Sequence, residues 1–360
     1  VYEMFYMDSI QDHTTCNLCV KLATDHGFGS LRGFVNGVLR NIARNKYSIV
    51  YPDRSEDLQK YLSVKYSIPE ELAGILLKDH DSDTVERMLE SGEDDRPTAI
   101  RVNTAVISAD DFADKLERAG INVSRGMISE TSLLISGYDY IRKVPGFFDG
   151  EFVVQDQSSC LAVKVADIQE GDLVVDVCAA PGGKTMYAAY FAGESGKVIS
   201  RDLTDKKTEL IEENVDRLGL RNVEVQVWDA REVDEELIGR ADVVIADLPC
   251  SGLGIMGRKN DIKYNVTDSS IDELAQLQRD ILDVVSGYVK PGGTLVYSTC
   301  TTDRRENQDN AAWFADNHDF KTVNIEDYLP GHGGHDGYIA LIQGVDECDG
   351  FFISKFRRDK

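Results

Sequence analysis

Two cysteines stand where they could act as nucleophiles. Cys250 closes the segment DLPC at residues 247–250, Cys300 closes the segment YSTC at 297–300, and each segment follows a short apolar run. The thiolate is the reactive form of cysteine, and because a free thiol has a pKa of about 8.5, a catalytic cysteine needs activation by its surroundings. Two such thiols beside one ligand pocket favour covalent catalysis, in which one attacks the substrate and the other assists product release.

Methylation of a pyrimidine ring at carbon 5 is a reaction that needs this pair. Cytosine C5 is too weak a nucleophile to accept a methyl group from a sulfonium directly, but addition of a thiolate to C6 gives an enamine-like ring that is nucleophilic at C5. The C5 proton must then leave and the thiolate must be expelled. Asp247 could hydrogen-bond the ring and favour protonation at N3. The residues alone leave open which cysteine is the nucleophile.

The segment DVCAAPGGKT at residues 176–185 is the candidate cofactor loop. It follows an apolar run and opens a predicted helix, where small residues let the backbone approach a ligand and the helix N-terminus supplies N–H groups. A phosphate-binding P-loop would need glycine in place of Cys178, and the dinucleotide pattern GxGxxG is absent. S-adenosylmethionine, which is nucleotide-like without a phosphate, therefore fits best. The predicted cofactor-binding residues of the loop are Cys178, Ala179, Ala180, Pro181, Gly182, Gly183 and Lys184.

Three acidic residues follow successive apolar runs. Asp202, Asp229 and Asp247 come at or just after runs at 197–201, 223–227 and 243–247. In a parallel sheet these positions lie at the ligand-binding edge, where a carboxylate binds ribose hydroxyls. We expect Asp202 to bind the ribose and Asp229 to lie near the adenine edge.

The elements that must position these residues alternate regularly from residue 151 onward. Five short apolar runs of buried parallel-strand type are separated by helix-like segments. They lie at 173–178, 197–201, 223–227, 243–247 and 294–298. The clearest helix begins near Ser270, which is predicted to form a capping box with Glu273, and ends before the PGG at 291–293. This alternation predicts an α/β fold with a Rossmann-like, doubly wound parallel sheet whose ligands bind at the carboxyl ends of the strands.

The residues before 151 divide into three predicted regions. Residues 1–45 are helical, and because the sequence opens on valine within a helix-like pattern, we expect it to begin inside a longer protein. Residues 46–95 form a polar helical linker region. Residues 96–150 form a small α/β domain that opens with a strand at 99–103, and residues 151–360 form the catalytic domain.

Composition excludes several classes of protein. The net charge of −24 argues against broad nonspecific nucleic-acid binding, although a local basic strip can still hold RNA. The sequence has no apolar stretch of about 18 residues, so no membrane span is predicted, and no secretory signal is visible. The odd number of irregularly spaced cysteines favours a reduced, cytoplasmic protein. Cys16 and Cys19 form a lone C-x-x-C, better read as core cysteines than as metal ligands, and no metal is expected.

Together these motifs resemble the Sun/NOL/NOP family of RNA cytosine-C5 methyltransferases, over nearly the whole chain. DIKY at 261–264 resembles the family's substrate loop, DGFFI at 349–353 its last strand, and RVN at 101–103 the start of its small RNA-binding domain of RRM or ferredoxin-like type. GFVNGVLR at 33–40 resembles the end of the NusB-like helical domain that marks the bacterial RsmB-type enzymes, which modify small-subunit (16S) ribosomal RNA. Asn260 departs from a frequent proline, and the segment before Asp202 is more polar than usual.

The resemblance assigns roles that the residues left open. It implies that Cys300 is the nucleophile, that Cys250 helps to release the product, and that S-adenosylmethionine is bound by 178–184, Asp202, Asp229 and Asp247. Because the target base must leave its stack, residues that hold RNA are also needed. Weaker predictions for RNA contact fall on Arg101, Asn103, Arg258, Lys263 and Tyr264.

The expected activity is S-adenosylmethionine-dependent formation of 5-methylcytosine in 16S rRNA by a monomer, with small-subunit ribosomal RNA as partner and no membrane. Two alternatives remain open at this point. One is a transfer RNA cytosine-C5 methyltransferase, against which the NusB-like segment argues. The other is a noncatalytic RNA-binding or ribosome assembly factor that retains the fold, against which both cysteines and the complete cofactor loop argue.

Overall fold

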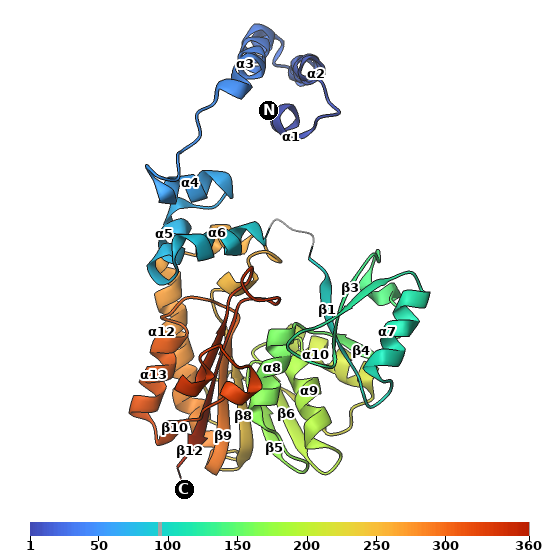
Figure 1. Ribbon diagram of the computed structural model, residues 1–360, viewed down its shortest axis with the longest axis vertical. Helices are drawn as coiled ribbons and strands as arrows, with labels where there is room; N and C mark the ends of the chain where they lie inside the picture. Colours follow the sequence, from blue (N-terminus) through green and yellow to red (C-terminus); the bar gives the residue numbers. More distant parts are fainter. Residues whose placement is uncertain (93–95, 360) are drawn as a thin grey trace. The chain divides into compact units, whose positions relative to one another are not determined.

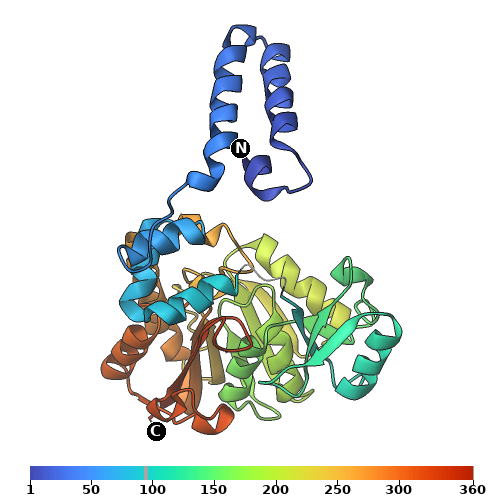
Figure 2. The same cartoon turned by 45° about the horizontal axis from the view of Figure 1, so that its top comes forward.

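The computed structural model describes residues 1–92 and 96–359, and the chain divides into two compact units, Val1–Lys65 and Tyr66–Lys360 (Figure 1). The first unit is helical, and its α2 and α3 form an antiparallel hairpin (Figure 2). Met4, Cys16 and Leu39 form its small core, and Cys19 packs against them. The helices are α1 (Tyr2–Tyr6), α2 (Asp12–Asp25), α3 (Arg32–Asn45) and α4 (Leu58–Lys65).

The second unit opens with two helices and a small antiparallel sheet. Helices α5 (Glu70–Asp79) and α6 (Ser82–Glu90) precede the sheet, whose strand order is β2-β3-β1-β4. Helix α7 packs on it through Phe112 and Leu116, because its apolar residues recur at helical spacing on one face. The elements are β1 (Thr98–Val102), α7 (Ala109–Arg118), β2 (Asn122–Arg125), β3 (Ser132–Ser136) and β4 (Phe152–Val154).

The rest of the second unit is built on a sheet with the order β10-β12-β9-β8-β5-β6-β7. Strands β5 to β9 are parallel, and β12 joins antiparallel to β9. The predicted doubly wound α/β fold is thereby confirmed. The strands are β5 (Leu173–Asp176), β6 (Lys197–Asp202), β7 (Val223–Val227), β8 (Ala241–Asp247), β9 (Val289–Thr299), β10 (Phe320–Thr322), β11 (Tyr338–Leu341) and β12 (Phe351–Arg358).

Helices cover both faces of this sheet (Figure 1). Alternate strand residues point to opposite faces, so that Val174 packs with α8 and α9 while its neighbour Val175 packs with α12 and α13. This double burial explains why the strands read as continuous apolar runs. The helices are α8 (Gln157–Ala166), α9 (Gly183–Ala192), α10 (Asp205–Leu218), α11 (Ile262–Asn265), α12 (Asp268–Val285) and α13 (Gln308–Asn317). No described helix meets the length and apolarity needed to cross a membrane.

Three local predictions need correction. The capping box of α12 is formed by Thr267 and Ser270, not by Ser270 and Glu273, because Thr267 is the extended residue whose hydroxyl accepts from the Ser270 N–H, and the Ser270 hydroxyl accepts from Thr267 in return. Strand β9 begins at Val289 rather than at 294, so the PGG segment belongs to its first half. Elsewhere the predicted strand at 173–178 ends two residues earlier.

Asp176, the last residue of β5, is a fully buried carboxyl group. Its Oδ2 accepts a hydrogen bond from Thr185 at 2.7 Å, whereas Oδ1 has no partner among the described residues. Burial raises the pKa of Asp176 to about 7. The charged form is therefore disfavoured in the folded protein, and the stability that the neutral carboxyl provides is lost as the pH rises from its unfolded pKa through about 7.

We predict that Asp176→Asn changes the pH dependence of thermal unfolding in the ligand-free protein. The melting temperature of the variant relative to wild type should rise between pH 5 and pH 8, because only the wild-type group becomes charged in that window. Asp216→Asn, at an exposed position on α10, serves as the control and should show no trend. A difference that stays flat or falls for Asp176→Asn would contradict the assignment.

Candidate functional site

The ends of β8 and β9 bring the two predicted cysteines together. The strands are parallel neighbours with Asp247 opposite Ser298, and the Leu248 N–H donates to the Ser298 carbonyl at 3.0 Å. Since Cys250 and Cys300 follow these residues at similar offsets, their Sγ atoms lie 3.3 Å apart. Each cysteine is partly buried. The pair is thus close enough for one thiol to donate a hydrogen bond to the other.

The electrostatics of the pair are asymmetric. The hydrogen bond from Cys250 lowers the pKa of the Cys300 thiol, and the charges of Lys184 and Lys259 act in the same direction, against burial and Asp247. The same hydrogen bond raises the pKa of Cys250 well above its usual value, reinforced by burial and by the nearby Glu306. Cys300 is therefore the thiol that ionises first, which suits it to nucleophilic attack.

A partly buried ion pair connects the candidate cofactor loop with the cysteine strands. Lys184, in the first turn of α9, places its Nζ 2.6 Å from Asp247 Oδ2, while the Ser298 hydroxyl donates to Asp247 Oδ1 at 2.8 Å. The Lys184 ammonium also lies over the Phe351 ring, 5.1 Å from its centroid. Asp247 is thus held in place by both a cation and a hydroxyl.

A cavity of about 610 Å³ opens at the carboxyl ends of β5, β6 and β8 and includes both cysteines in its wall. Pockets for small molecules span about 300–1,000 Å³, so the size suits a nucleotide-like ligand. Of the predicted cofactor residues, those that line the cavity are Cys178, Ala180, Asp202, Asp229 and Asp247. The described lining does not include Ala179, Pro181, Gly182, Gly183 or Lys184, which shape the turn into α9 and, for Lys184, hold Asp247.

The two further acidic residues are held differently. Asp202 accepts hydrogen bonds from the Ala180 N–H at 2.9 Å and the Leu203 N–H at 2.8 Å, so its carboxylate is fixed at the cavity wall. Asp229 is paired with Arg231, whose side chain and backbone N–H lower the pKa of Asp229. Both carboxylates are thus held in place, Asp202 by two backbone donors and Asp229 by Arg231.

Sequence reasoning missed several residues of the cavity. Leu203 lines it with 54% of its surface exposed, and Lys207, Trp228 and Lys259 also belong to the wall. Leu203 and Trp228 adjoin the predicted Asp202 and Asp229, so strand-end position was a usable signal for them. The buried Arg201 guanidinium lies over the Trp228 ring, with its Cζ 4.5 Å from the ring centroid. This contact gives Arg201, the unusual polar residue before Asp202, a structural role.

The predicted RNA-contacting residues differ in their exposure and in their partners. The structure contradicts the prediction for Arg101, which is 4% exposed, donates to Gln155 and lies over the Tyr187 ring. Asn103 donates from its side chain to the Gly150 carbonyl. Lys263 and Tyr264 lie on α11, where Tyr264 is 63% exposed and donates its hydroxyl proton to the Ser67 carbonyl.

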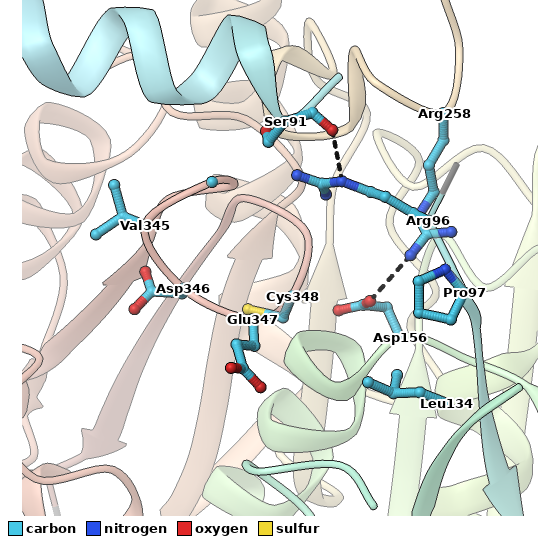
Figure 3. A pocket seen from close by; sticks show the side chains of 11 residues that line it. Ser91, Arg96, Pro97, Leu134, Asp156, Arg258, Val345, Asp346, Glu347 and Cys348 are labelled. Carbon is cyan, nitrogen blue, oxygen red and sulfur yellow. Dashed lines mark hydrogen bonds and ion pairs between the residues drawn. The ribbon is translucent and has the colours of Figure 1, made fainter. Parts of the chain in front are cut away.

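Arg258 faces a second cavity, of about 430 Å³, that shares no described lining residue with the first (Figure 3). Its guanidinium donates to Asp349 at 2.7 Å and lies 3.7 Å from Asp156. Figure 3 shows Arg96 extending beside it, with a hydrogen bond to the Ser91 carbonyl. Although about a third of the Arg258 side chain is exposed, its charge is already neutralised by carboxylates. It therefore anchors the loop after Cys250 rather than offering a free charge to phosphate.

The doubly wound sheet, with a cavity at the carboxyl ends of its strands, is typical of Rossmann-like enzymes that bind a nucleotide-like ligand. Residues 163–357 match the family model described as 16S rRNA methyltransferase RsmB/F, residues 1–44 match the NusB family, and residues 68–139 match the ferredoxin-like domain of RsmF/B-like methyltransferases. The chain belongs to the RsmB/F family, and it is therefore an rRNA methyltransferase.

Curated relatives and solved structures agree with this assignment. The probable ribosomal RNA small subunit methyltransferase B of Bacillus subtilis is 34% identical, over 99% of this chain and 81% of the relative, and the Klebsiella pneumoniae enzyme is 30% identical, over 99% and 79%. The crystal structure of PH0851 superposes with a TM-score of 0.82 at 28% identity, covering 99% of this chain and 80% of that one. A methyltransferase homolog from Pyrococcus horikoshii gives 0.73 at 26%, covering 84% and 99%.

Gly254 is a position on which the placement of the Cys300 backbone depends directly. Its N–H donates to the Cys300 carbonyl at 3.0 Å, and its own carbonyl accepts from the Gly350 N–H at 2.8 Å. A Cβ at Gly254 would collide with the Gly350 carbonyl and lie 2.9 Å from the Cys300 carbonyl oxygen. The atoms that a new Cβ would meet belong to the backbone of Gly350 and Cys300, so no flexible side chain can move aside to make room.

We predict that Gly254→Ala destabilises the protein by about 2 kcal/mol or more, because overpacking at rigid contacts costs about this much. Urea unfolding would measure the loss, and methyltransferase activity should fall further than the folded fraction does, since the Cys300 backbone must shift. Gly37→Ala on α3, where a Cβ meets nothing within 4 Å, is the control and should not destabilise the protein, because alanine favours a helix interior over glycine by up to about 1 kcal/mol. Unchanged stability of Gly254→Ala would contradict the close approach.

Proposed function

We propose that this enzyme transfers a methyl group from S-adenosylmethionine to carbon 5 of a cytosine in small-subunit ribosomal RNA, with Cys300 as covalent nucleophile. The observation that carries the proposal is the 3.3 Å separation of the Cys250 and Cys300 Sγ atoms in the wall of a nucleotide-sized cavity. The names of the relatives, which are small-subunit rRNA methyltransferases, support the choice of RNA.

The cavity residues fit S-adenosylmethionine. Leu203 and Trp228 offer apolar surface for an adenine ring, and the Asp202 carboxylate beside them is placed for ribose hydroxyls. Lys207, which pairs with Asp202 at 2.9 Å, is half exposed and free to move aside. When bound, S-adenosylmethionine supplies an electrophilic methyl group. The protein's own residues hold the donor and activate the base.

The first step requires a thiolate at Cys300. Its lowered pKa, caused first by the Cys250 hydrogen bond, provides the ionised sulfur. The sulfur forms a bond to cytosine C6, and the electrons of the C5–C6 double bond pass into the ring toward N3, which leaves C5 nucleophilic. Asp247, fixed by Lys184 and Ser298, is placed to hydrogen-bond the ring and favour protonation at N3.

Product release requires a base and a leaving thiolate. Once Cys300 Sγ is bonded to carbon, it no longer accepts the proton of Cys250, so the main cause of the raised Cys250 pKa disappears. Cys250 can then lose its proton to solvent and, as a thiolate, accept the proton from C5. The electrons of the C5–H bond re-form the C5–C6 double bond, and the bond between C6 and sulfur breaks to return the Cys300 thiolate.

We predict opposite outcomes for the two cysteine variants. Cys300→Ala should abolish methylation without forming a covalent complex, whereas Cys250→Ala should accumulate protein bound covalently to RNA, seen as a slowly migrating band on a denaturing gel. Cys19→Ala, in the helical first unit, is the control and should behave as wild type. A band that forms with Cys300→Ala and not with Cys250→Ala would reverse the roles.

The RNA target can be mapped with the purified enzyme. We predict that bisulfite sequencing after treatment with enzyme and S-adenosylmethionine will show new 5-methylcytosine in 16S rRNA, with unmodified 16S and transfer RNA from a deletion strain as substrates. Methylation confined to transfer RNA would reject the proposed target while retaining the chemistry. Calorimetry that detects RNA binding but no S-adenosylmethionine binding would instead indicate a noncatalytic factor.

A further inference from the structure

The residues directly after the two cysteines are joined by a buried chain of hydroxyl groups. Ser251 follows Cys250, Thr301 follows Cys300, and their side-chain oxygens lie 2.7 Å apart. The Ser251 hydroxyl donates in turn to Glu306 Oε2, and the Ser251 N–H donates to Glu306 Oε1 at 2.9 Å. Because Ser251 is bound to Glu306 and to Thr301, the backbone positions beside both sulfur atoms are fixed by one carboxyl group.

Glu306 is fully buried, and its carboxyl oxygens accept hydrogen bonds from Ser251 and Gln278. Besides Ser251, the Gln278 side chain donates to its Oε1 at 3.0 Å and also to the Pro249 carbonyl at 2.9 Å. The Tyr297 hydroxyl donates to Gln278 Oε1 at 2.9 Å and so fixes the orientation of that amide. Glu306 therefore contacts the loop on both sides of Cys250, and three hydrogen bonds offset part of its desolvation.

The charges around the thiol pair are divided between its two ends. On the Cys250 side lie Glu306, whose carboxyl group is hydrogen-bonded to Ser251, and the neutral phenol of Tyr297. Burial raises the pKa of Glu306, and its hydrogen bonds from Ser251 and Gln278 act against that rise and favour the carboxylate. On the Cys300 side are Asp247, which is paired with Lys184, and the exposed Lys259, whose side chain lines the same cavity. A negative charge near Cys250 favours its protonated form, and a positive charge near Cys300 favours its ionised form.

We propose that Glu306 is a positioning residue that keeps the shared proton on Cys250, with Lys259 as the opposing charge, and so decides which of the two thiols attacks. The proposal rests on the proposed function for the meaning of that choice, but not for its test, which needs neither RNA nor methyl donor. Nothing about two adjacent cysteines by themselves selects one of them. The selection comes from the buried carboxylate of Glu306 near Cys250 and the exposed ammonium of Lys259 near Cys300.

The test is alkylation of the reduced enzyme by iodoacetamide, with the rate at each cysteine followed by peptide mass spectrometry from pH 6 to pH 10. In wild type, Cys300 should react faster than Cys250. In Glu306→Gln, the ratio of the two rates should fall by about tenfold and the pH profile of Cys250 should move to lower pH. Loss of the nearby anion lowers the pKa of Cys250, and a change of one pKa unit alters the thiolate fraction about tenfold below the pKa. Glu306→Asp, which keeps the charge, should restore much of the preference.

Lys259→Gln offers a second measurement at an exposed position where folding is not at risk. It should lower the Cys300 to Cys250 ratio in the same direction, by about two- to threefold, since an exposed charge acts through more solvent than a buried one. The matched controls are Glu273→Gln on α12 and Lys206→Gln on α10, both exposed, and neither should change the ratio.

The outcomes separate cleanly. A folded Glu306→Gln protein with the wild-type ratio and pH profile would overturn the proposal. If thermal unfolding shows that Glu306→Gln does not fold, Lys259→Gln decides, and an unchanged ratio there overturns it. Failure of the proposed function would appear differently, as absent methylation or an absent covalent complex in an enzyme whose Cys300 still alkylates first.

Discussion

The hydrogen-bonded register between β8 and β9 is the contact from which the site follows. Adjacent parallel strands lie about 4.8 Å apart, so residues that follow neighbouring strand ends at similar offsets remain close. Asp247 lies opposite Ser298, and the two sulfur atoms that follow meet at 3.3 Å. The topology also makes this edge the place where the strand order turns, between β5 and β8, so the thiols adjoin the ligand cavity.

Strand register alone would leave two loop cysteines with many conformations, and buried polar contacts remove that freedom. Glu306 and Gln278 hold the loop around Cys250, while Gly254 and Gly350 allow two backbones to cross beneath Cys300. Buried polar groups are costly unless they are hydrogen-bonded. In this network they are paired, so their cost is offset while they fix one geometry for the two sulfur atoms.

The acidic composition of the enzyme is consistent with where its cations lie. The cations near the site are largely matched: Lys184 with Asp247, Arg258 with Asp349, and Arg201 with Asp234. These pairs orient the cofactor loop, the loop after Cys250 and the Trp228 wall, respectively. Arginine and lysine in this part of the chain therefore serve first to hold the catalytic surface together. RNA binding at a net charge of −24 then calls on cations near the site that remain exposed, such as Lys259.

The sequence by itself determined the α/β alternation, the order of the strands along the chain, and the cofactor loop, because apolar periodicity and glycine-rich turns are local properties. It also singled out Cys250 and Cys300, since their segments end two such strands. It could not separate Arg101, which enters the core, from a surface cation, nor find Trp228 or the buried Glu306, because charge and type do not reveal burial. Only the tertiary structure decided which thiol has the anion behind it, since Glu306 reaches Ser251 across 55 residues through folding alone.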